Sequence, residues 1–106
     1  MPFLKLDNIE KRNPLPGCSV RFVHTENMTL SYWNLEPGAQ IPNHSHHHEQ
    51  VTTVIEGELE MTVNGKTQRV GPGCVVPIPS NAKHSANALS ACYVLDVFYP
   101  VREDYL

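Results

Sequence analysis

Four of the six histidines in the chain lie within residues 44–48. Side chains alternate between the two faces of an extended strand, so His44, His46 and Gln50 would share one face. Glu49 would then point the opposite way, and a metal ion would meet imidazoles and one amide oxygen. A bulge between the histidines and Gln50 would turn Glu49 inward instead. Alternation alone favours Gln50 as the ligand.

The other histidines receive weaker assignments. His47 is expected to face solvent, and His48 to line a pocket or stand behind the ligands. His24 has no neighbouring donors and is expected to be an ordinary strand residue. The alternative for the whole histidine-rich turn is a solvated loop that binds metal only incidentally.

Composition limits the class of protein. The chain has 106 residues, with eight basic and eleven acidic side chains and a net charge of −3. This length predicts one domain over residues 1–106, and the lack of a Lys/Arg cluster makes nucleic acid an unexpected partner. No basic, apolar leader and no membrane-length apolar run occur, so we expect a soluble, unexported, cytoplasmic protein with no membrane partner. Its three cysteines are expected to be free thiols.

Short apolar or alternating segments between turn residues predict an all-β protein. Asn64-Gly65 is a strong type I′ hairpin signal, so the segments on either side should pair antiparallel. Residues 1–16 are expected to be an N-terminal arm or strand. The expected strands are Ser19–His24, Met28–Leu35, Val51–Glu56, Leu59–Val63, Thr67–Val70, Cys74–Ile78, His84–Ala88 and Ala91–Tyr99.

Many short antiparallel strands around a polar cluster suit a small double-sheet jelly roll, whose interior can hold a ligand. An immunoglobulin-like sandwich would fit the strand count equally well. The sandwich would not explain histidines that point inward.

A first spaced pattern in the middle of the chain resembles the first motif of the cupin family. Gln stands where that motif more usually has Glu. The matching residues are Gly38, His44, His46, Gln50 and Gly57.

A second pattern follows the first in the order that the cupin family shows. It runs from Gly73 through Pro79 and Asn81 to His84, with Asn81 where the family has Gly. Asn is a tolerable replacement because it also enters the left-handed region of backbone space. His84 at this spacing makes the incidental-loop alternative much weaker.

The resemblance implies a double-stranded β-helix, the jelly-roll barrel of cupins. It also implies one divalent transition metal (Ni, Zn, Fe or Mn) held by His44, His46, Gln50 and His84. Four neutral ligands would leave the ion its full double charge, which suits a Lewis acid acting on a carboxylate, hydroxyl or enolate.

The C-terminal stretch from Leu95 to Leu106 resembles the ending of the small pectin-degradation cupins, which linearise unsaturated uronates. In that group the residues matching Asp96, Phe98 and Arg102 line the pocket. Strand alternation independently places Asp96 and Phe98 on one face.

Each charged residue of this stretch also has a structural alternative. Asp96 could pair with a lysine or a backbone amide, because buried carboxylates also serve ion-pair networks. Arg102 could form a surface ion pair with Glu103 or Asp104. Trp33 is expected in the core, with a pocket wall as the alternative.

The opposite face of the last strand predicts assembly. An apolar face of this kind is not expected to stay in water, so we expect a homodimer that buries it. A monomer would mean that residues 1–16 cover it instead. The face comprises Tyr93, Leu95, Val97 and Tyr99.

Together these features predict a metal-dependent cupin that converts 4,5-unsaturated uronate monomers, small acidic sugars, to linear keto-uronates. Asp96 would move a proton, Arg102 would anchor the substrate carboxylate, and Phe98 would line the pocket. The alternatives are a cupin dioxygenase that uses iron or copper and a non-catalytic cupin that binds metal or a metabolite. A single domain has nothing to regulate in cis, which argues against the binding module.

Overall fold

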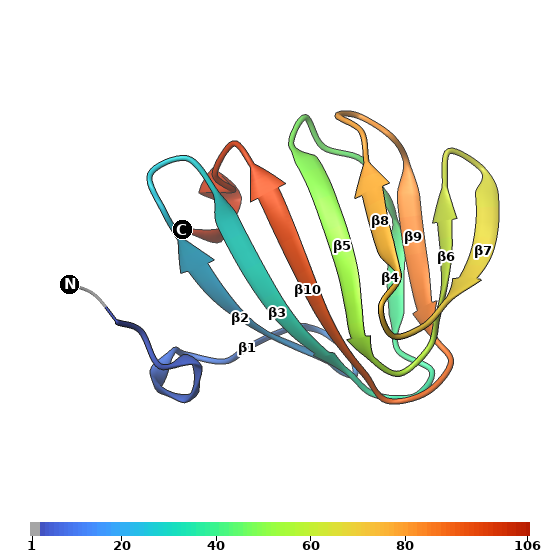
Figure 1. Cartoon of the computed structure of the whole chain (residues 1–106), viewed down its shortest axis with the longest axis horizontal. Helices are drawn as coiled ribbons and strands as arrows, with labels where there is room; N and C mark the ends of the chain where they lie inside the picture. The colour runs from blue at the N-terminus through green and yellow to red at the C-terminus, as the bar shows by residue number, and fades with distance from the viewer. Residues whose placement is uncertain (1–2) are drawn as a thin grey trace.

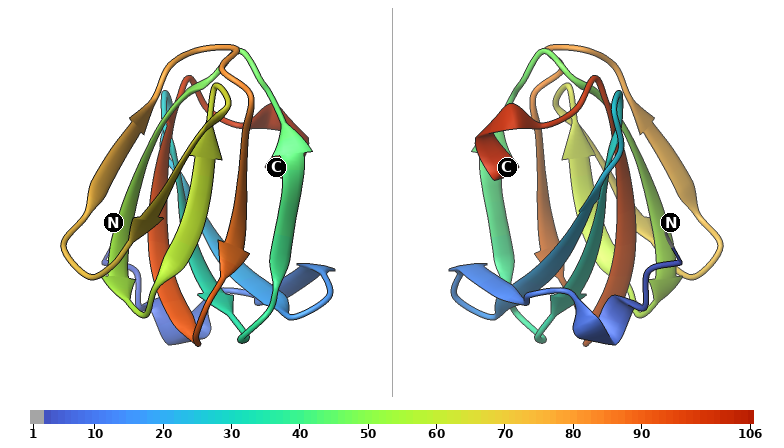
Figure 2. Two further views of the ribbon diagram at one scale, coloured as in Figure 1. Left: turned by 90° about the vertical axis from the view of Figure 1, so that its right-hand side faces the viewer. Right: turned by 90° about the vertical axis from the view of Figure 1, so that its left-hand side faces the viewer.

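Two antiparallel sheets face each other in the computed structural model, which describes residues 3–106 (Figures 1 and 2). The six-stranded sheet has the order β1-β2-β3-β10-β5-β8 and the four-stranded sheet the order β4-β9-β6-β7. This is the expected all-β jelly roll. The strands are β1 (Arg12–Leu15), β2 (Cys18–His24), β3 (Thr29–Leu35), β4 (Gln40–His44), β5 (Glu49–Glu56), β6 (Leu59–Val63), β7 (Lys66–Val70), β8 (Val75–Ile78), β9 (His84–Ala88) and β10 (Cys92–Tyr99).

The single extended strand that would carry His44, His46 and Gln50 is not formed, and the strand that contains Gln50 begins only at Glu49. β4 ends at His44 in the four-stranded sheet, and β5 begins at Glu49 in the six-stranded sheet. Residues 45–48 form the loop that crosses between the sheets. The crossing lies at one end of the barrel (Figure 1), and Ser45 and His47 within it are exposed.

The hairpin predicted at Asn64-Gly65 is confirmed. Both residues have positive φ angles, 50° and 79°, as a type I′ turn requires. Val63 pairs with Lys66 across the turn, and β6 and β7 run antiparallel.

Gly57 closes the turn between β5 and β6. Its φ is 84°, and a Cβ atom at this position would lie 2.1 Å from the carbonyl oxygen of Ala91. Only glycine avoids that clash, which explains its place at the end of the first motif.

β10 lies in the middle of the six-stranded sheet, between β3 and β5. Its side chains alternate as expected: Val94, Asp96 and Phe98 are buried, while Leu95 and Val97 on the other face are partly exposed. The buried apolar side chains of both sheets form one cluster between the layers. The carboxyl of Asp96 lies in this largely apolar interior, and a buried carboxyl there indicates a site.

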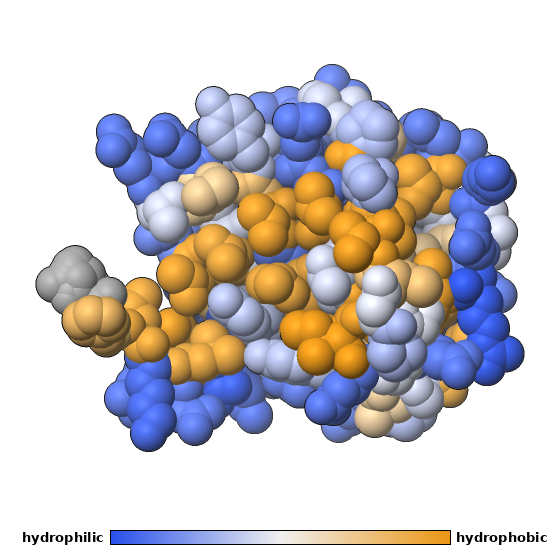
Figure 3. Space-filling view, in the orientation of Figure 1, coloured by the Kyte–Doolittle hydropathy of each residue, from blue (hydrophilic) through white to orange (hydrophobic). Residues whose placement is uncertain are grey.

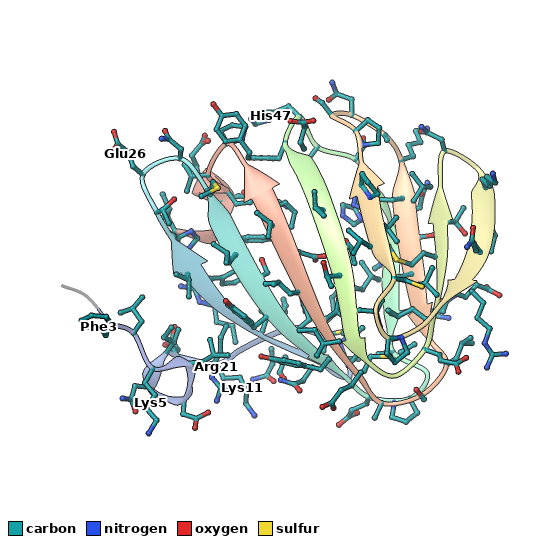
Figure 4. The ribbon with its side chains drawn as sticks, viewed as in Figure 1. Phe3, Lys5, Lys11, Arg21, Glu26 and His47 are labelled. Carbon is teal, nitrogen blue, oxygen red and sulfur yellow. The ribbon has the colours of Figure 1, made fainter. Side chains whose placement is uncertain are left out.

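The N-terminal segment extends beyond the edge of the sheet. It contains a 3-10 turn, η1 (Leu6–Asn8), before β1 pairs with β2. Phe3, labelled in Figure 4, and Leu4 are 105% and 67% exposed. A second 3-10 turn, η2 (Glu103–Tyr105), ends the chain. Of the helices within residues 3–106, none has the length and apolar character needed to cross a bilayer.

Candidate active site

Three histidines converge at one end of the barrel from separate elements. His44 ends β4, and His84 begins β9 and pairs with His44 across the sheet. His46 lies in the loop between β4 and β5. The ring centroids of His44 and His84 are 4.2 Å apart, and those of His46 and His84 are 5.0 Å apart. One nitrogen from each ring lies within 4.8 Å of the others.

Backbone carbonyls orient the three rings. The Nδ1 atoms of His44, His46 and His84 lie 2.8, 3.1 and 3.0 Å from the carbonyl oxygens of Pro42, His48 and Ala82. With Nδ1 as the donor, each Nε2 carries a lone pair, and the buried Nε2 of His84 has no hydrogen-bond partner among the described residues. Metal-binding histidines are characteristically held through their second nitrogen in this way. The residues present therefore fit a metal ion.

Gln50 completes the donor set. Its Oε1 lies 3.1 Å from Nε2 of His46, and its Nε2 donates to the hydroxyl of Thr52 at 2.9 Å. In that tautomer, two lone pairs meet at the His46–Gln50 contact, and a cation between them would remove the repulsion. Gln50 is buried and Glu49 is exposed, which is the orientation that strand alternation predicted.

Residues of the second motif hold the histidine-containing loop, residues 45–48, through hydrogen bonds. Asn81 has a φ of 66°, the left-handed conformation that Asn tolerates in place of Gly. In this conformation the backbone N–H of Asn81 donates to the backbone carbonyl of His46 at 2.8 Å. The hydroxyl of Ser80 donates to the carbonyl of His47 at 2.6 Å.

Asp96 lies behind the donors, joined to them by hydrogen bonds. The Thr52 hydroxyl donates to its carboxylate at 2.6 Å, so the polar contacts run from Gln50 through Thr52 to Asp96. This partner is a hydroxyl, not the lysine or backbone amide considered as the alternative. Burial raises the pKa of Asp96 to about 6, and the hydrogen bond from Thr52 opposes that rise.

Arg102 is buried between two aromatic rings. The guanidinium carbon lies 4.7 Å from the ring centroid of Phe98 and 4.2 Å from that of Tyr105. Its Nε and Nη2 donate to the two carboxylate oxygens of Asp104 at 3.0 and 2.7 Å. The ion pair with Asp104 considered from the sequence is therefore present, but the arginine in it is buried and not on the surface.

These groups share one cavity of about 300 Å³. Three of the four donors line it, namely His44, Gln50 and His84. The carboxyl of Asp96, the guanidinium of Arg102 and apolar side chains of both sheets line it as well. Trp33 is buried and also lines the cavity, so it is both a core residue and a wall. The volume is at the lower end of the range for small-molecule sites and suits a ligand the size of a monosaccharide.

A family profile described as a cupin domain matches residues 31–98, more than half of the chain. The chain belongs to the cupin family. Among solved structures, KdgF from Halomonas sp. is 28% identical with a TM-score of 0.93, over 100% of this chain and 99% of that one. An RmlC-like cupin from Shewanella frigidimarina is 25% identical with a TM-score of 0.93, over 98% and 95% of the two chains.

A deletion mutant of the Bacillus subtilis oxalate decarboxylase is also similar to this cupin. It is 26% identical with a TM-score of 0.82, over 92% of this chain and 29% of that one. No curated protein sequence matches this cupin closely enough to count as a relative.

Burial favours the neutral form of two of the candidate ligands, His46 and His84. Burial, followed by the positive charge of Arg102, lowers the pKa of His46 to about 4. Burial also lowers the pKa of His84. Neutral imidazole is the form that binds metal, so no proton has to leave these rings at neutral pH.

Two cavity residues that contact Asp96 or Arg102, namely Thr52 and Tyr105, were not singled out from the sequence. Thr52 lies on the buried face of β5 with Gln50, and its contact with Asp96 depends on the pairing of β5 with β10. Tyr105 lies in η2, where strand alternation does not apply, and it reaches the cavity because the chain turns back after β10.

Proposed function

We propose that this chain is a single-domain cupin enzyme that converts a 4,5-unsaturated uronate monomer to its linear keto form. One observation carries the proposal: polar contacts run from His46 through Gln50 and Thr52 to Asp96, and the last three residues line a cavity that Arg102 also lines. The overall likeness to KdgF agrees with the resemblance of the C-terminal stretch to the pectin-degradation cupins.

The reaction requires a cation to hold and polarise the substrate oxygens. The three histidines and Gln50 supply a site for that cation. A divalent ion held by His44, His46, Gln50 and His84 would supply a Lewis acid beside the substrate oxygens. The protein residues supply the remaining requirements, namely binding, orientation and proton transfer.

The reaction is an isomerisation, so protons must balance within it. The hydroxyl on carbon 1 loses a proton as the bond between carbon 1 and the ring oxygen breaks. Carbon 4 gains a proton as the enol at carbon 5 becomes a ketone. Asp96 can accept the first proton and return one to carbon 4, because a pKa of about 6 leaves both its forms accessible near neutral pH.

Arg102 would anchor the substrate carboxylate. A guanidinium binds a carboxylate through two parallel hydrogen bonds, and the rings of Phe98 and Tyr105 hold it in position. Asp104 occupies two of its donors in this structure, so a substrate carboxylate would have to displace Asp104 or use the remaining nitrogen.

We also propose that the functional unit is a homodimer. The outer face of the six-stranded sheet has a broad apolar area, which Figure 3 shows across the middle of the molecule. Val51, Ile55 and Tyr99 on this face are 38%, 42% and 56% exposed. Residues 3–106 of one copy leave these three side chains in contact with water, which supports a second copy as the partner of this face.

Turnover of an unsaturated uronate, followed by the loss of its conjugated ultraviolet absorbance, tests the proposal. Metal-loaded protein should accelerate this loss above the spontaneous rate, and chelator should abolish the acceleration. No acceleration with either uronate epimer would reject linearisation and favour the dioxygenase or the binding module.

Two variants separate the roles within the site. Asp96→Asn should lower kcat by about 10² to 10⁴, the usual contribution of a general acid or base, with metal content unchanged. Arg102→Lys should mainly raise KM, because a lysine does not reproduce the bidentate contact. Equal effects of the two variants on kcat and KM would contradict these separate roles.

A further inference from the structure

A second group of metal-type donors lies outside the cavity. His47 and His48 belong to the loop between β4 and β5, and Glu103 begins η2. One donor atom from each of the three residues lies within 4.8 Å of the others. His47, labelled in Figure 4, lies at the end of the barrel near the C-terminal segment.

His48 is the residue that points to a ligand. It is 5% exposed, and neither of its ring nitrogens has a hydrogen-bond partner among the described residues. A buried imidazole whose nitrogens make no hydrogen bond lowers the stability of the fold, and native structures rarely contain one. Binding of a cation to one of its nitrogens would remove that cost.

The surroundings of His48 suit a cation. The ring of His47 lies 3.9 Å from it, centroid to centroid, at an angle of 33°. The carboxylate of Glu103 makes no hydrogen bond or ion pair with any residue of the described part. The nearby charge of Arg102 is offset by its bidentate pair with Asp104.

We propose that His47, His48 and Glu103 form a second site for a divalent transition metal, of which zinc is the test case. Two imidazoles and one carboxylate are a donor set that zinc accepts, with water in the remaining position. A tetrahedral ion with bonds of about 2.0 Å needs donors about 3.3 Å apart. His47 and Glu103 are exposed and free to close the remaining distance.

The position of this site has a consequence for the cavity. An ion bound there would tie the histidine loop to η2. η2 carries Asp104 and Tyr105, which contact Arg102. The second ion would therefore hold in place the C-terminal segment, whose Arg102 and Tyr105 line the cavity.

Metal stoichiometry tests the proposal without any measurement of turnover. Chelator-treated full-length protein is titrated with zinc by calorimetry, and bound zinc is counted by elemental analysis. Wild type should bind two ions per chain. His47→Ala and Glu103→Gln should each bind one, while the matched variant Glu60→Gln on the outside of β6 should still bind two.

The cavity site provides the complementary control. His44→Ala should lose the cavity ion and keep the second, and the double variant His44→Ala/His47→Ala should bind none. A wild type that binds one ion, or a Glu103→Gln variant that binds two, would overturn the proposal. Either result leaves the proposed uronate activity untouched, because that activity depends on the cavity donors.

Hydrogen exchange gives a second readout. The amides of Tyr105 and Leu106 donate to the carbonyls of Arg102 and Glu103 at 3.0 and 3.2 Å. Zinc should slow their exchange in wild type and in His44→Ala, but not in Glu103→Gln. Equal slowing in Glu103→Gln would mean that zinc orders the segment from the cavity and not from the second site.

Discussion

Gln50 determines the charge of the candidate metal centre. A neutral amide stands where a carboxylate is more usual in the family motif, and Glu49 beside it faces solvent. An ion at this centre would keep a greater net charge than one bound by a Glu, and would attract anionic oxygen ligands more strongly.

Gln50→Ala should weaken zinc binding in the cavity by about tenfold or more, because one of four donors is lost. Glu49→Ala should leave the affinity unchanged. Calorimetry in a His47→Ala background measures the cavity site alone. If Glu49→Ala loses metal and Gln50→Ala retains it, the strand register around Gln50 is different from the one described here.

Asp96 makes the folded protein less stable as the pH rises, which is the opposite of the effect of most carboxylates. Its pKa is raised from the ordinary 3.8 to about 6, because burial disfavours the charged form. The folded protein therefore holds this proton more tightly than the unfolded chain. The resulting stabilisation is complete below about pH 3.8 and is lost as the pH rises through about 6.

Asp96→Asn should remove this dependence, since an amide does not ionise. The melting temperature of metal-free Asp96→Asn, minus that of metal-free wild type, should rise between about pH 4 and pH 7. Taking the difference cancels the opposite contribution of His46, which both proteins share. A difference that is constant or falls with pH would show that the carboxyl is not held protonated by burial.

At the scale of elements, the end of β10 and the turn η2 form one unit. β10 supplies Asp96 and Phe98 to the cavity, and the chain then turns back so that Arg102 and Tyr105 line it too. Asp104 in the same turn holds the guanidinium. We expect Asp104 to act as an internal competitor for the substrate carboxylate.

Asp104→Asn should therefore lower KM about two- to fivefold, the range that corresponds to a partly exposed ion pair of about 0.5 to 1 kcal/mol. Steady-state kinetics with Glu60→Gln as the control separates this effect from a general loss of negative charge. A rise in KM would instead mean that Asp104 positions Arg102 for the substrate.

At the scale of the whole molecule, the six-stranded sheet has two different faces. Its inner face forms the cavity wall, and its outer face is apolar across β3, β10 and β5 (Figure 3). In the homodimer that we propose, a twofold axis would pack this outer face against the same face of a second copy.

Light scattering should report a mass of about twice 11.9 kDa for wild type. Val51→Glu places a charge on the apolar face, opposite Val97, and should weaken the dimer by about 2 kcal/mol or more. Gln68→Glu, exposed on β7 of the other sheet, should remain dimeric. A monomeric wild type would reject the dimer, and a dimer that survives Val51→Glu would place the interface elsewhere.

Local rules were enough for much of the fold. The period of two along β10 predicted which side chains point inward, because alternation follows from backbone geometry alone. The turn at Asn64-Gly65 was predicted for the same reason, since positive φ angles select these residues. The spaced motifs predicted that His44, His46, Gln50 and His84 would lie together.

Contacts between distant segments depended on the tertiary structure. The histidine run looked like part of one strand, but His44 and Gln50 lie in different sheets, because the chain crosses the barrel end between them. Thr52 meets Asp96 only through the pairing of β5 with β10, and Asp104 meets Arg102 only because β10 is followed by a tight turn. Such contacts depend on how strands pair and turns fold back, and the residues nearest in sequence carry little of that information.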